Sequence, residues 1–389
     1  MKYKKKSLKN LTMIRLLYNI VLFTALLLPF ATQAETDEDM SRKERKSFST
    51  PGEISLELIN KYGDIIIHTW DKDSVRAEVT ITAHGKKDSG LRKMLDRVDI
   101  EMRQTGSYIR LESELDRSSG SISEFFKNIG DQSRTLLSKN KLEVNWVIYL
   151  PERAEVILEN KFGDIFMEAV HGKSRIDLAH GNIRSNGLHG YSRLTLSYGE
   201  ADIDYIKEAY LEGKVYEVFI NKADYLTISG SSSEYSMKEV KTLKMDSRND
   251  DIRINTLYSL TGTSSFSKIS IKHLRQQVDA NLKYGELSID LVQKGFSKLV
   301  IKAQSTDVSL HMDDQAGYIY DITAEEDRLT LPRNMQEESR DYPEDKNKYV
   351  HITGKGGPVH NSPSRIRIDA EGGSLDLGFS ILQSPSVNH

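Results

Sequence analysis

Residues 162–199 decide the fold and read, in groups of nine, FGDIFMEAV HGKSRIDLA HGNIRSNGL HGYSRLTLS YG. Each group opens with an aromatic residue or His, and Gly follows. The groups alternate in kind, because residues 174–178 (SRIDL) resemble residues 192–196 (SRLTL) and Phe162-Gly163 resembles Tyr198-Gly199. Apolar and polar residues also alternate within each short run, as they do in a half-buried strand. The pattern therefore predicts a structural repeat of eighteen residues that contains two short strands.

The same unit recurs outside this stretch. Residues 60–65 (NKYGDI) and 160–165 (NKFGDI) are near-identical hexapeptides one hundred residues apart, and each connects two apolar runs. Further copies of the strand, mostly 17 or 18 residues apart, lie at residues 217–220, 251–254, 268–271, 286–289 and 307–310. The repeat therefore extends over most of the chain.

These spacings predict an all-β protein, a parallel β-solenoid with two short strands per coil of about 18 residues. Each strand offers too few large apolar side chains to stabilise an isolated hairpin, whereas stacked coils bury them and pair every backbone group. About eight coils between residues 160 and 310 would form a rod on the order of 40 Å long. The Gly after each aromatic residue is expected to supply the corner conformation. An antiparallel sandwich is the alternative, although its strands have no reason to keep this spacing.

The first residues predict export. Residues 1–34 have the layout of a signal peptide, with a basic start, an apolar run over residues 16–30 and small residues before a cleavage point after Ala34. A retained membrane anchor is the alternative, but Tyr18, Asn19 and Pro29 interrupt the apolar run. We expect the mature protein in the periplasm, on the outer-membrane surface or in the medium.

The composition and charge of the chain limit the classes of partner that it is expected to bind. Cleavage would remove six Lys and Arg and no acidic residue, which lowers the formal charge from −3 to −9. An acidic chain without a basic block argues against nucleic acid and anionic membranes as partners. Beyond the leader the sequence has no second apolar segment of spanning length, so no transmembrane segment is expected after cleavage. The chain has no Cys, which excludes disulfides, a thiol nucleophile and a lipoprotein anchor.

The predicted organisation has six parts. These are a signal peptide (1–34), a disordered linker (35–52), an N-terminal β unit (53–150) with a helical insertion at 117–141, solenoid repeats (151–331), a polar loop (332–362) and C-terminal capping strands (363–381). The two segments that break the repeat, residues 117–141 and 332–362, are the places where we expect any function-bearing surface.

Three His-Gly pairs are the strongest candidates for a site. His171 and His189 should stack on one corner about 4.8 Å apart, with His180 on the opposite corner. A metal bound to the stacked pair is one hypothesis. Extension of an aromatic ladder is the other, favoured because Phe and Tyr occupy the equivalent positions elsewhere. The turns lack the second Gly and the Asp of calcium-binding nonapeptides, so calcium is not expected.

Carboxylates and tyrosines are the remaining candidates. The carboxylates Asp164, Asp177, Asp202 and Asp204 should point outward, where a pair could act on a glycosidic bond, although outward acids also serve solubility. The repeat-position tyrosines Tyr62, Tyr198, Tyr216 and Tyr284 could stack on sugars but are explained by the corner ladder. No catalytic, cofactor-binding or metal-binding residue is predicted, and no cofactor is expected.

With the Asn-Lys-aromatic-Gly-Asp-Ile corners, Leu150-Pro151 and the leader, residues 53–380 resemble the exported bacterial β-solenoid family called "putative adhesin". That resemblance implies a fold like the heads of surface adhesins and no catalytic residue. The function we expect is therefore non-enzymatic binding of a protein or glycan at the cell envelope through a repetitive β face. Two alternatives are a carbohydrate-active β-helix enzyme and a periplasmic accessory protein of an envelope signalling system.

Overall fold

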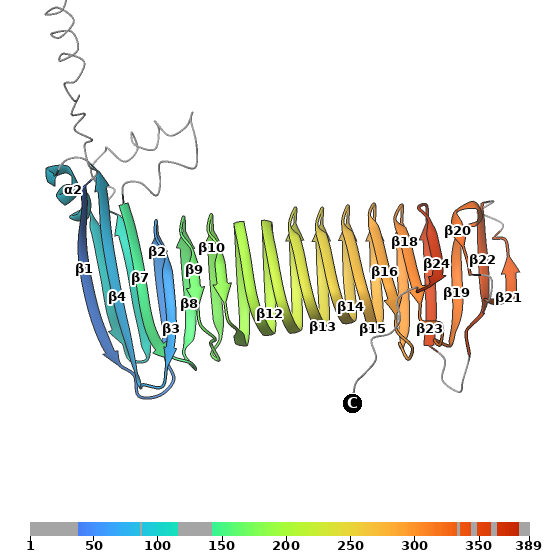
Figure 1. The fold of residues 1–389 in the computed structure, drawn as a ribbon, viewed down its shortest axis with the longest axis horizontal. Helices are drawn as coiled ribbons and strands as arrows, with labels where there is room; N and C mark the ends of the chain where they lie inside the picture. Colours follow the sequence, from blue (N-terminus) through green and yellow to red (C-terminus); the bar gives the residue numbers. More distant parts are fainter. Residues whose placement is uncertain are drawn as a thin grey trace, which may run out of the picture.

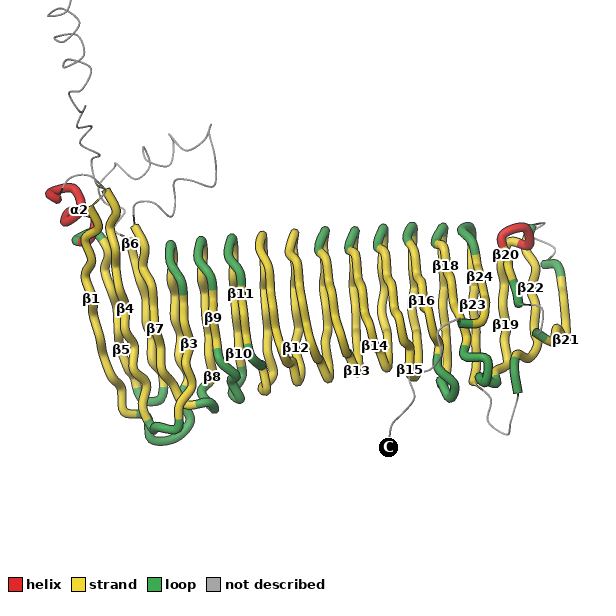
Figure 2. The backbone as a smooth tube through the Cα atoms, viewed as in Figure 1, coloured by secondary structure: helices red, strands yellow, loops and turns green. Residues whose placement is uncertain are grey.

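The computed structural model describes residues 38–85, 88–115, 142–332, 335–343, 348–358 and 364–380. The predicted signal peptide and the predicted helical insertion at 117–141 lie outside these residues. The chain winds into an elongated β-solenoid whose strands lie side by side along the long axis (Figure 1). Within the described part, helix occurs only near the two ends of the rod, at α2 (Asp88–Leu95) and at the single turn η1 (Glu326–Arg328) (Figure 2).

The regular middle is made by strands that pair in parallel with the next coil. They are β8 (Glu155–Lys161), β9 (Ile165–Met167), β10 (Ser174–Ala179), β11 (Ile183–Ser185), β12 (Leu188–Ser231), β13 (Glu234–Arg248), β14 (Asp251–Ser265), β15 (Lys268–Lys283), β16 (Glu286–Val292), β17 (Lys298–Gln304) and β18 (Asp307–Met312). Ser174 lies opposite Val156 on one side and Ser192 on the other, which is the predicted step of eighteen. From Glu217 to Glu234 to Asp251 the step is seventeen. The prediction of an all-β parallel solenoid is confirmed.

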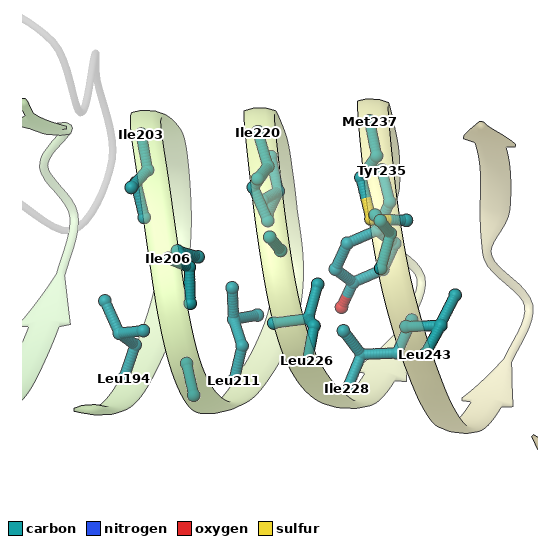
Figure 3. Close-up of a cluster of buried hydrophobic side chains, with 14 of the residues drawn as sticks. Leu194, Ile203, Ile206, Leu211, Ile220, Leu226, Ile228, Tyr235, Met237 and Leu243 are labelled. Atoms are coloured by element: carbon teal, nitrogen blue, oxygen red, sulfur yellow. The ribbon is translucent and has the colours of Figure 1, made fainter. Parts of the chain in front are cut away.

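Apolar side chains fill the inside of the coils. Ile203, Ile220 and Met237 occupy the same position in successive coils, and each is nearly inaccessible to solvent (Figure 3). Burying one such side chain contributes about 1.5–3 kcal/mol relative to leaving it exposed. The stacked interior positions therefore act together with the parallel backbone pairing to hold the coils in register.

The N-terminal end departs from simple winding. The coil formed by β2 (Ser55–Lys61) and β3 (Ile65–Trp70) lies between β8 and β9 on one side and β6 (Tyr108–Leu115) and β7 (Leu142–Pro151) on the other. The two NK-aromatic-GDI hexapeptides are therefore stacked directly, although one hundred residues separate them. Beyond this coil, β4 (Ser74–Gly85) pairs antiparallel with β7, and β5 (Val98–Thr105) pairs antiparallel with β6.

The prediction of a disordered linker over residues 35–52 is wrong for the residues described. The segment forms β1 (Glu38–Ser49), which pairs antiparallel with β4 along its whole length. Phe48 is buried and Met40 packs against the core, so the strand contributes apolar anchors despite its many charges. Arg42 donates to the carbonyl of Val98 (2.7 Å) and Lys46 to that of Met102 (2.7 Å). These cationic side chains satisfy carbonyl groups at the edge of β5, which protects the end of the solenoid against further strand pairing.

The C-terminal end has a similar arrangement. It contains β19 (Tyr318–Glu325), β20 (Leu329–Thr330), β21 (Gln336–Asp341), β22 (Tyr349–Gly356), β23 (Ser364–Glu371) and β24 (Leu375–Phe379). β23 pairs with β17 and β19, and β24 pairs with β18 and β20, so this last coil lies between strands that precede it (Figure 1).

Two predictions about this end need correction. Residues 332–362 are not merely a polar loop, because β22 within them pairs antiparallel with β19, and β21 pairs antiparallel with β22. The strands within residues 363–381 are not the outer cap, since they form an interior coil that β19 to β22 cover. Their apolar residues, such as Ile366 and Ile368, are buried on that account.

Candidate functional site

One corner of the solenoid has a left-handed backbone in every regular coil. The residues that adopt it, with φ between 47° and 64°, are Tyr62, Phe162, His180, Tyr198, Val215, Ser232, Asn249, Phe266, Tyr284 and Ser305. The expectation that the following Gly supplies this conformation is wrong. Gly163 does not have a positive φ, but a Cβ there would lie 2.0 Å from the carbonyl oxygen of Gly63. Gly is required by the close approach of the neighbouring coil, whereas the residue before it makes the turn.

Stacked rings line this corner. The ring of Phe162 lies 5.5 Å from that of Tyr62 and 5.0 Å from that of His180, and His180 lies 4.8 Å from Tyr198. Phe266 and Tyr284 form a second run at 5.0 Å. Because the interior ring faces are covered by neighbours, such rings present mainly their edges to solvent. The rings thus form the aromatic corner ladder that the sequence favoured.

Tyr216 does not belong to the corner, contrary to the nine-residue spacing. The step from Tyr198 shortens to seventeen, so Val215 takes the corner position and Tyr216 turns inward. Its hydroxyl donates to the carbonyl of Gly181 (2.7 Å), and its ring packs over Gly199, where the missing Cβ leaves room. Burial raises its pKa.

The His pair lies on a different corner and stacks as predicted. The rings of His171 and His189 are 4.5 Å apart and nearly parallel, and Tyr205 continues the column at 4.9 Å. Burial, followed by the nearby charge of His171, lowers the pKa of His189. The nitrogen lone pairs of two face-to-face imidazoles lie in parallel planes and do not converge, so this pair is poorly arranged to chelate one metal ion. Among the described residues no group of three or more His, Cys, Asp or Glu is placed to hold a metal.

The carboxylates singled out from the sequence serve different contacts. Asp164 accepts a hydrogen bond from the backbone N–H of Asn182 (2.8 Å), as part of a ladder that links successive coils. Asp177 accepts from Arg175 (3.1 Å), and Asp202 pairs with Arg184 (3.4 Å). Asp204 is exposed on the outer face.

A polar cluster is buried inside the same coils. Asp250 accepts from the backbone N–H of Ser233 (2.8 Å), the hydroxyl of Ser247 (2.7 Å) and the backbone N–H of Arg248 (3.1 Å). Burial raises the pKa of Asp250 despite these donors. The hydroxyl of Tyr235, labelled in Figure 3, points into this interior. The cluster is enclosed by the coils and offers no approach for a large ligand.

The outer face carries a shallow groove that crosses several coils of β12 to β15. We call it the Phe219 groove; its volume is about 560 Å³, and it is bounded by Phe219, Asn221, Lys238, Arg253, Asn255 and Lys272. Phe219, Ser236, Arg253 and Ser270 are register partners in consecutive coils, so the small serines leave hollows between the larger side chains. The groove therefore combines one aromatic surface, two amides and three cationic side chains with two carboxylates, those of Asp202 and Asp290.

A second groove lies near the N-terminal end, next to the His column. It encloses about 950 Å³, and its walls include Trp70, Lys72, Arg153, His171 and Lys173. Trp70 stacks on Tyr149 (5.4 Å) and donates its indole N–H to the carbonyl of Ser74 (2.8 Å), and Lys72 lies over its ring. Its ring is thus already engaged within the protein, which leaves the Phe219 groove as the better candidate for ligand contact.

The chain belongs to the Toastrack DUF4097 family, whose sequence profile matches residues 53–355. A comparison with curated proteins finds no match. Among solved structures, a "putative cell adhesion protein" from Clostridium sporogenes is 9% identical, covers 87% of this chain and 99% of its own, and has a TM-score of 0.24.

Two further solved structures are similar to the chain. A "putative lipid binding protein" from Parabacteroides distasonis is 12% identical over 69% of this chain and 93% of its own, with a TM-score of 0.29. A "putative adhesin" from Bacteroides fragilis is 10% identical over 70% and 91%, with a TM-score of 0.24. TM-scores this low give no support for transferring a ligand.

No helix in the described ranges is long and apolar enough to cross a membrane. The groove was not predicted from the sequence, because its residues form no motif of known chemistry and come together only as a column across coils. A usable signal was present: Asn221, Lys238, Asn255 and Lys272 recur every seventeen residues, each directly after an inward apolar residue. This polar column can be recognised in the sequence only if the repeats are aligned with a period of seventeen residues instead of eighteen.

Proposed function

We propose that this protein is a non-enzymatic, exported binding protein of the bacterial cell envelope or surface that contacts a protein or glycan through its repetitive outer face. The observation that carries the proposal is the Phe219 groove, an open surface built from the same positions of consecutive coils. Regular spacing of about 4.8 Å between equivalent side chains suits a ligand that is itself extended and repetitive.

A screen on residues 35–389 tests this proposal. The purified protein is applied to a glycan array and to extracted envelope proteins, and the same preparation is assayed for release of reducing sugars from polysaccharides. We expect saturable binding without turnover. Release of reducing ends would overturn the proposal in favour of a carbohydrate-active enzyme.

Export is part of the proposal and needs its own measurement. The N-terminal pattern supports cleavage after Ala34, so the protein from the cell envelope should begin at Glu35. Fractionation followed by N-terminal sequencing checks this. A full-length protein that remains in the cytoplasmic fraction would contradict it.

A further inference from the structure

The Phe219 groove carries charges of both signs along its length. One carboxylate of its lining, Asp202, comes from the first coil that the groove crosses, and the other, Asp290, comes from the last. The cationic side chains come from the coils between them. A chain of uniform charge, negative or positive, would therefore meet like charges as well as opposite ones, and like charges that face each other weaken binding. The groove thus favours a ligand without net charge.

Two of the cationic side chains also have acidic neighbours. Arg253 pairs with Asp251 and with Glu234 (3.5 Å). Lys272 and Asp290 follow paired residues of β15 and β16, so they lie beside one another in adjacent coils. These contacts reduce the positive potential that the groove presents to a ligand.

The floor of the groove repeats every two coils. One column of register partners alternates between a large planar group and a small hydroxyl group, in the order Phe219, Ser236, Arg253 and Ser270. Successive coils are about 4.8 Å apart, so equivalent groups recur every ~9.6 Å. The hollows over the two serines therefore alternate with raised planar groups.

The neighbouring column has the same period. It alternates between an amide and an ammonium group, in the order Asn221, Lys238, Asn255 and Lys272. Amides both donate and accept hydrogen bonds, which matches the character of sugar hydroxyl groups. Each two-coil unit of the groove thus offers a planar surface, a hollow and an amide.

We infer that the Phe219 groove binds a neutral β-1,4-linked polysaccharide whose chain runs along the solenoid axis. This inference rests on the proposed function and names its ligand class. In an extended β-1,4-linked chain every second sugar has the same orientation, and one disaccharide is close in length to two coils. Alternate sugars can therefore rest on the planar groups of Phe219 and Arg253, while the sugars between them lie over the serine hollows.

Phe219 supplies the apolar contact. It is half-buried on the outer face, and within the described residues no aromatic ring stacks on it, unlike the rings of the corner ladder. The face of an aromatic ring carries partial negative charge, so it attracts the C–H bonds on the face of a sugar.

An extended peptide matches the groove less well. A β-strand repeats every two residues, or about 6.6 Å, which differs from the ~9.6 Å of two coils. A polyproline helix repeats every three residues, at about 9.3 Å, but the grooves that recognise it are lined by aromatic residues. Among the described residues that line this groove, Phe219 is the one aromatic residue.

Titration calorimetry on residues 35–389 tests the ligand class. The ligands are the β-1,4-linked hexasaccharides of glucose and of N-acetylglucosamine, and the α-1,4-linked hexasaccharide of glucose is the comparison. We expect at least one β-linked ligand to bind, and the α-linked ligand to bind at least about tenfold more weakly. The affinity should change by less than about twofold between about 0.05 M and about 0.5 M salt, because the ligand is uncharged.

Two variants test the site. Phe219→Ala removes the ring and should weaken binding about fivefold to tenfold. Ser236→Trp fills a hollow and should weaken binding by more than about tenfold. Thr242→Trp is the matched control, because it adds the same side chain at a half-buried position of the same strand, β13, outside the groove. The control should change affinity by less than about twofold. Circular dichroism establishes that each variant folds.

The outcomes separate the two proposals. Equal losses in Ser236→Trp and in the control, or no loss in Phe219→Ala, would overturn the site. Equal binding of the α-linked ligand, binding that salt weakens, or binding of a proline-rich peptide in place of both β-linked ligands would overturn the ligand class but leave the proposed function standing. Cleavage of a hexasaccharide would overturn the proposed function itself.

Discussion

The middle of the solenoid and its two ends use the same strand pairing but different routes of the chain. In the middle, each coil pairs with the one that follows it seventeen, eighteen or twenty-one residues later. At the ends, a coil is completed by segments far away in the sequence: β2 pairs with β8 at a separation of one hundred residues, and β17 with β23 at sixty-seven. The regular repeat thus elongates the rod, whereas segments from distant parts of the sequence, which fold back onto the solenoid, terminate it.

The largest effect on stability is expected where the first coil of the middle meets the coil of the N-terminal end. Gly163→Ala would place a Cβ 2.0 Å from the carbonyl oxygen of Gly63, a collision with the backbone of the neighbouring coil that no rotamer relieves. We expect a loss of more than about 4 kcal/mol in the free energy of unfolding, measured by urea denaturation. Gly90→Ala is the control, since nothing lies within 4 Å of that position in α2, and it should change stability by less than about 1 kcal/mol. Equal midpoints for the two variants would refute the close-approach role of this Gly.

The next effect concerns the returning coil at the C-terminal end. Ile368 lies between Ile301 and Ile322 and is buried, so Ile368→Ala should cost about 3 kcal/mol. In a solenoid each coil contacts only its neighbours, and the loss should therefore accelerate amide hydrogen exchange in β19 to β24 before β10 to β12. Ile319→Ala, at a partly exposed position on the same end, serves as the comparison. Acceleration spread evenly over the whole rod would show that the ends are not separate units.

A smaller, favourable effect is expected within the middle. Val215 is β-branched yet has φ 52°, a conformation that costs a non-Gly residue roughly 1–2 kcal/mol. Asn tolerates it better, so Val215→Asn should raise the free energy of unfolding by about 1 kcal/mol. Val300→Asn, on a strand without positive φ, should not stabilise. A lower melting temperature for Val215→Asn would contradict the assignment of strain to this corner.

The smallest effect is a pH dependence of the His column. The pKa of His189 is lowered by burial and by His171 and Lys207, with Glu152 acting in the opposite sense. The neutral form of His189 is thus favoured in the folded state. The free energy of unfolding therefore decreases as pH falls from about 6.5, the pKa of His in the unfolded chain, towards the lower pKa of the folded state. His189→Phe keeps the stack and removes the titrating group, so its melting temperature should fall less between pH 7.5 and 5.5 than that of the wild type. His180→Phe, in the other ladder, is the comparison and should leave the wild-type drop in place.

The sequence alone predicted much of the fold and less of the site. The eighteen-residue alternation around residues 162–199 predicted the parallel coils, the stacked His pair and the outward carboxylates. The switch to seventeen residues was noticed in the spacings, but its consequence for Tyr216 was not. A one-residue slip moves a side chain from the surface to the interior. The Phe219 groove was missed for the same reason, since its column exists only in the seventeen-residue register.

Local pattern by itself determined the class of fold, because alternation of apolar and polar residues at a fixed period leaves one face to bury, and identical coils bury it best. Only the tertiary structure decided how the rod ends and which outward residues share a groove. The charged segment of β1 becomes a strand because it pairs with β4 and because its own side chains Met40 and Phe48 pack against the core. In the coil of β23 and β24, β23 lies between β17 and β19. Its pairing with β17 joins residues sixty-seven positions apart, which no local pattern encodes. Columns of side chains such as Lys238 and Lys272 arise from the stacking of coils, so their chemistry appears only once the register of every coil is set.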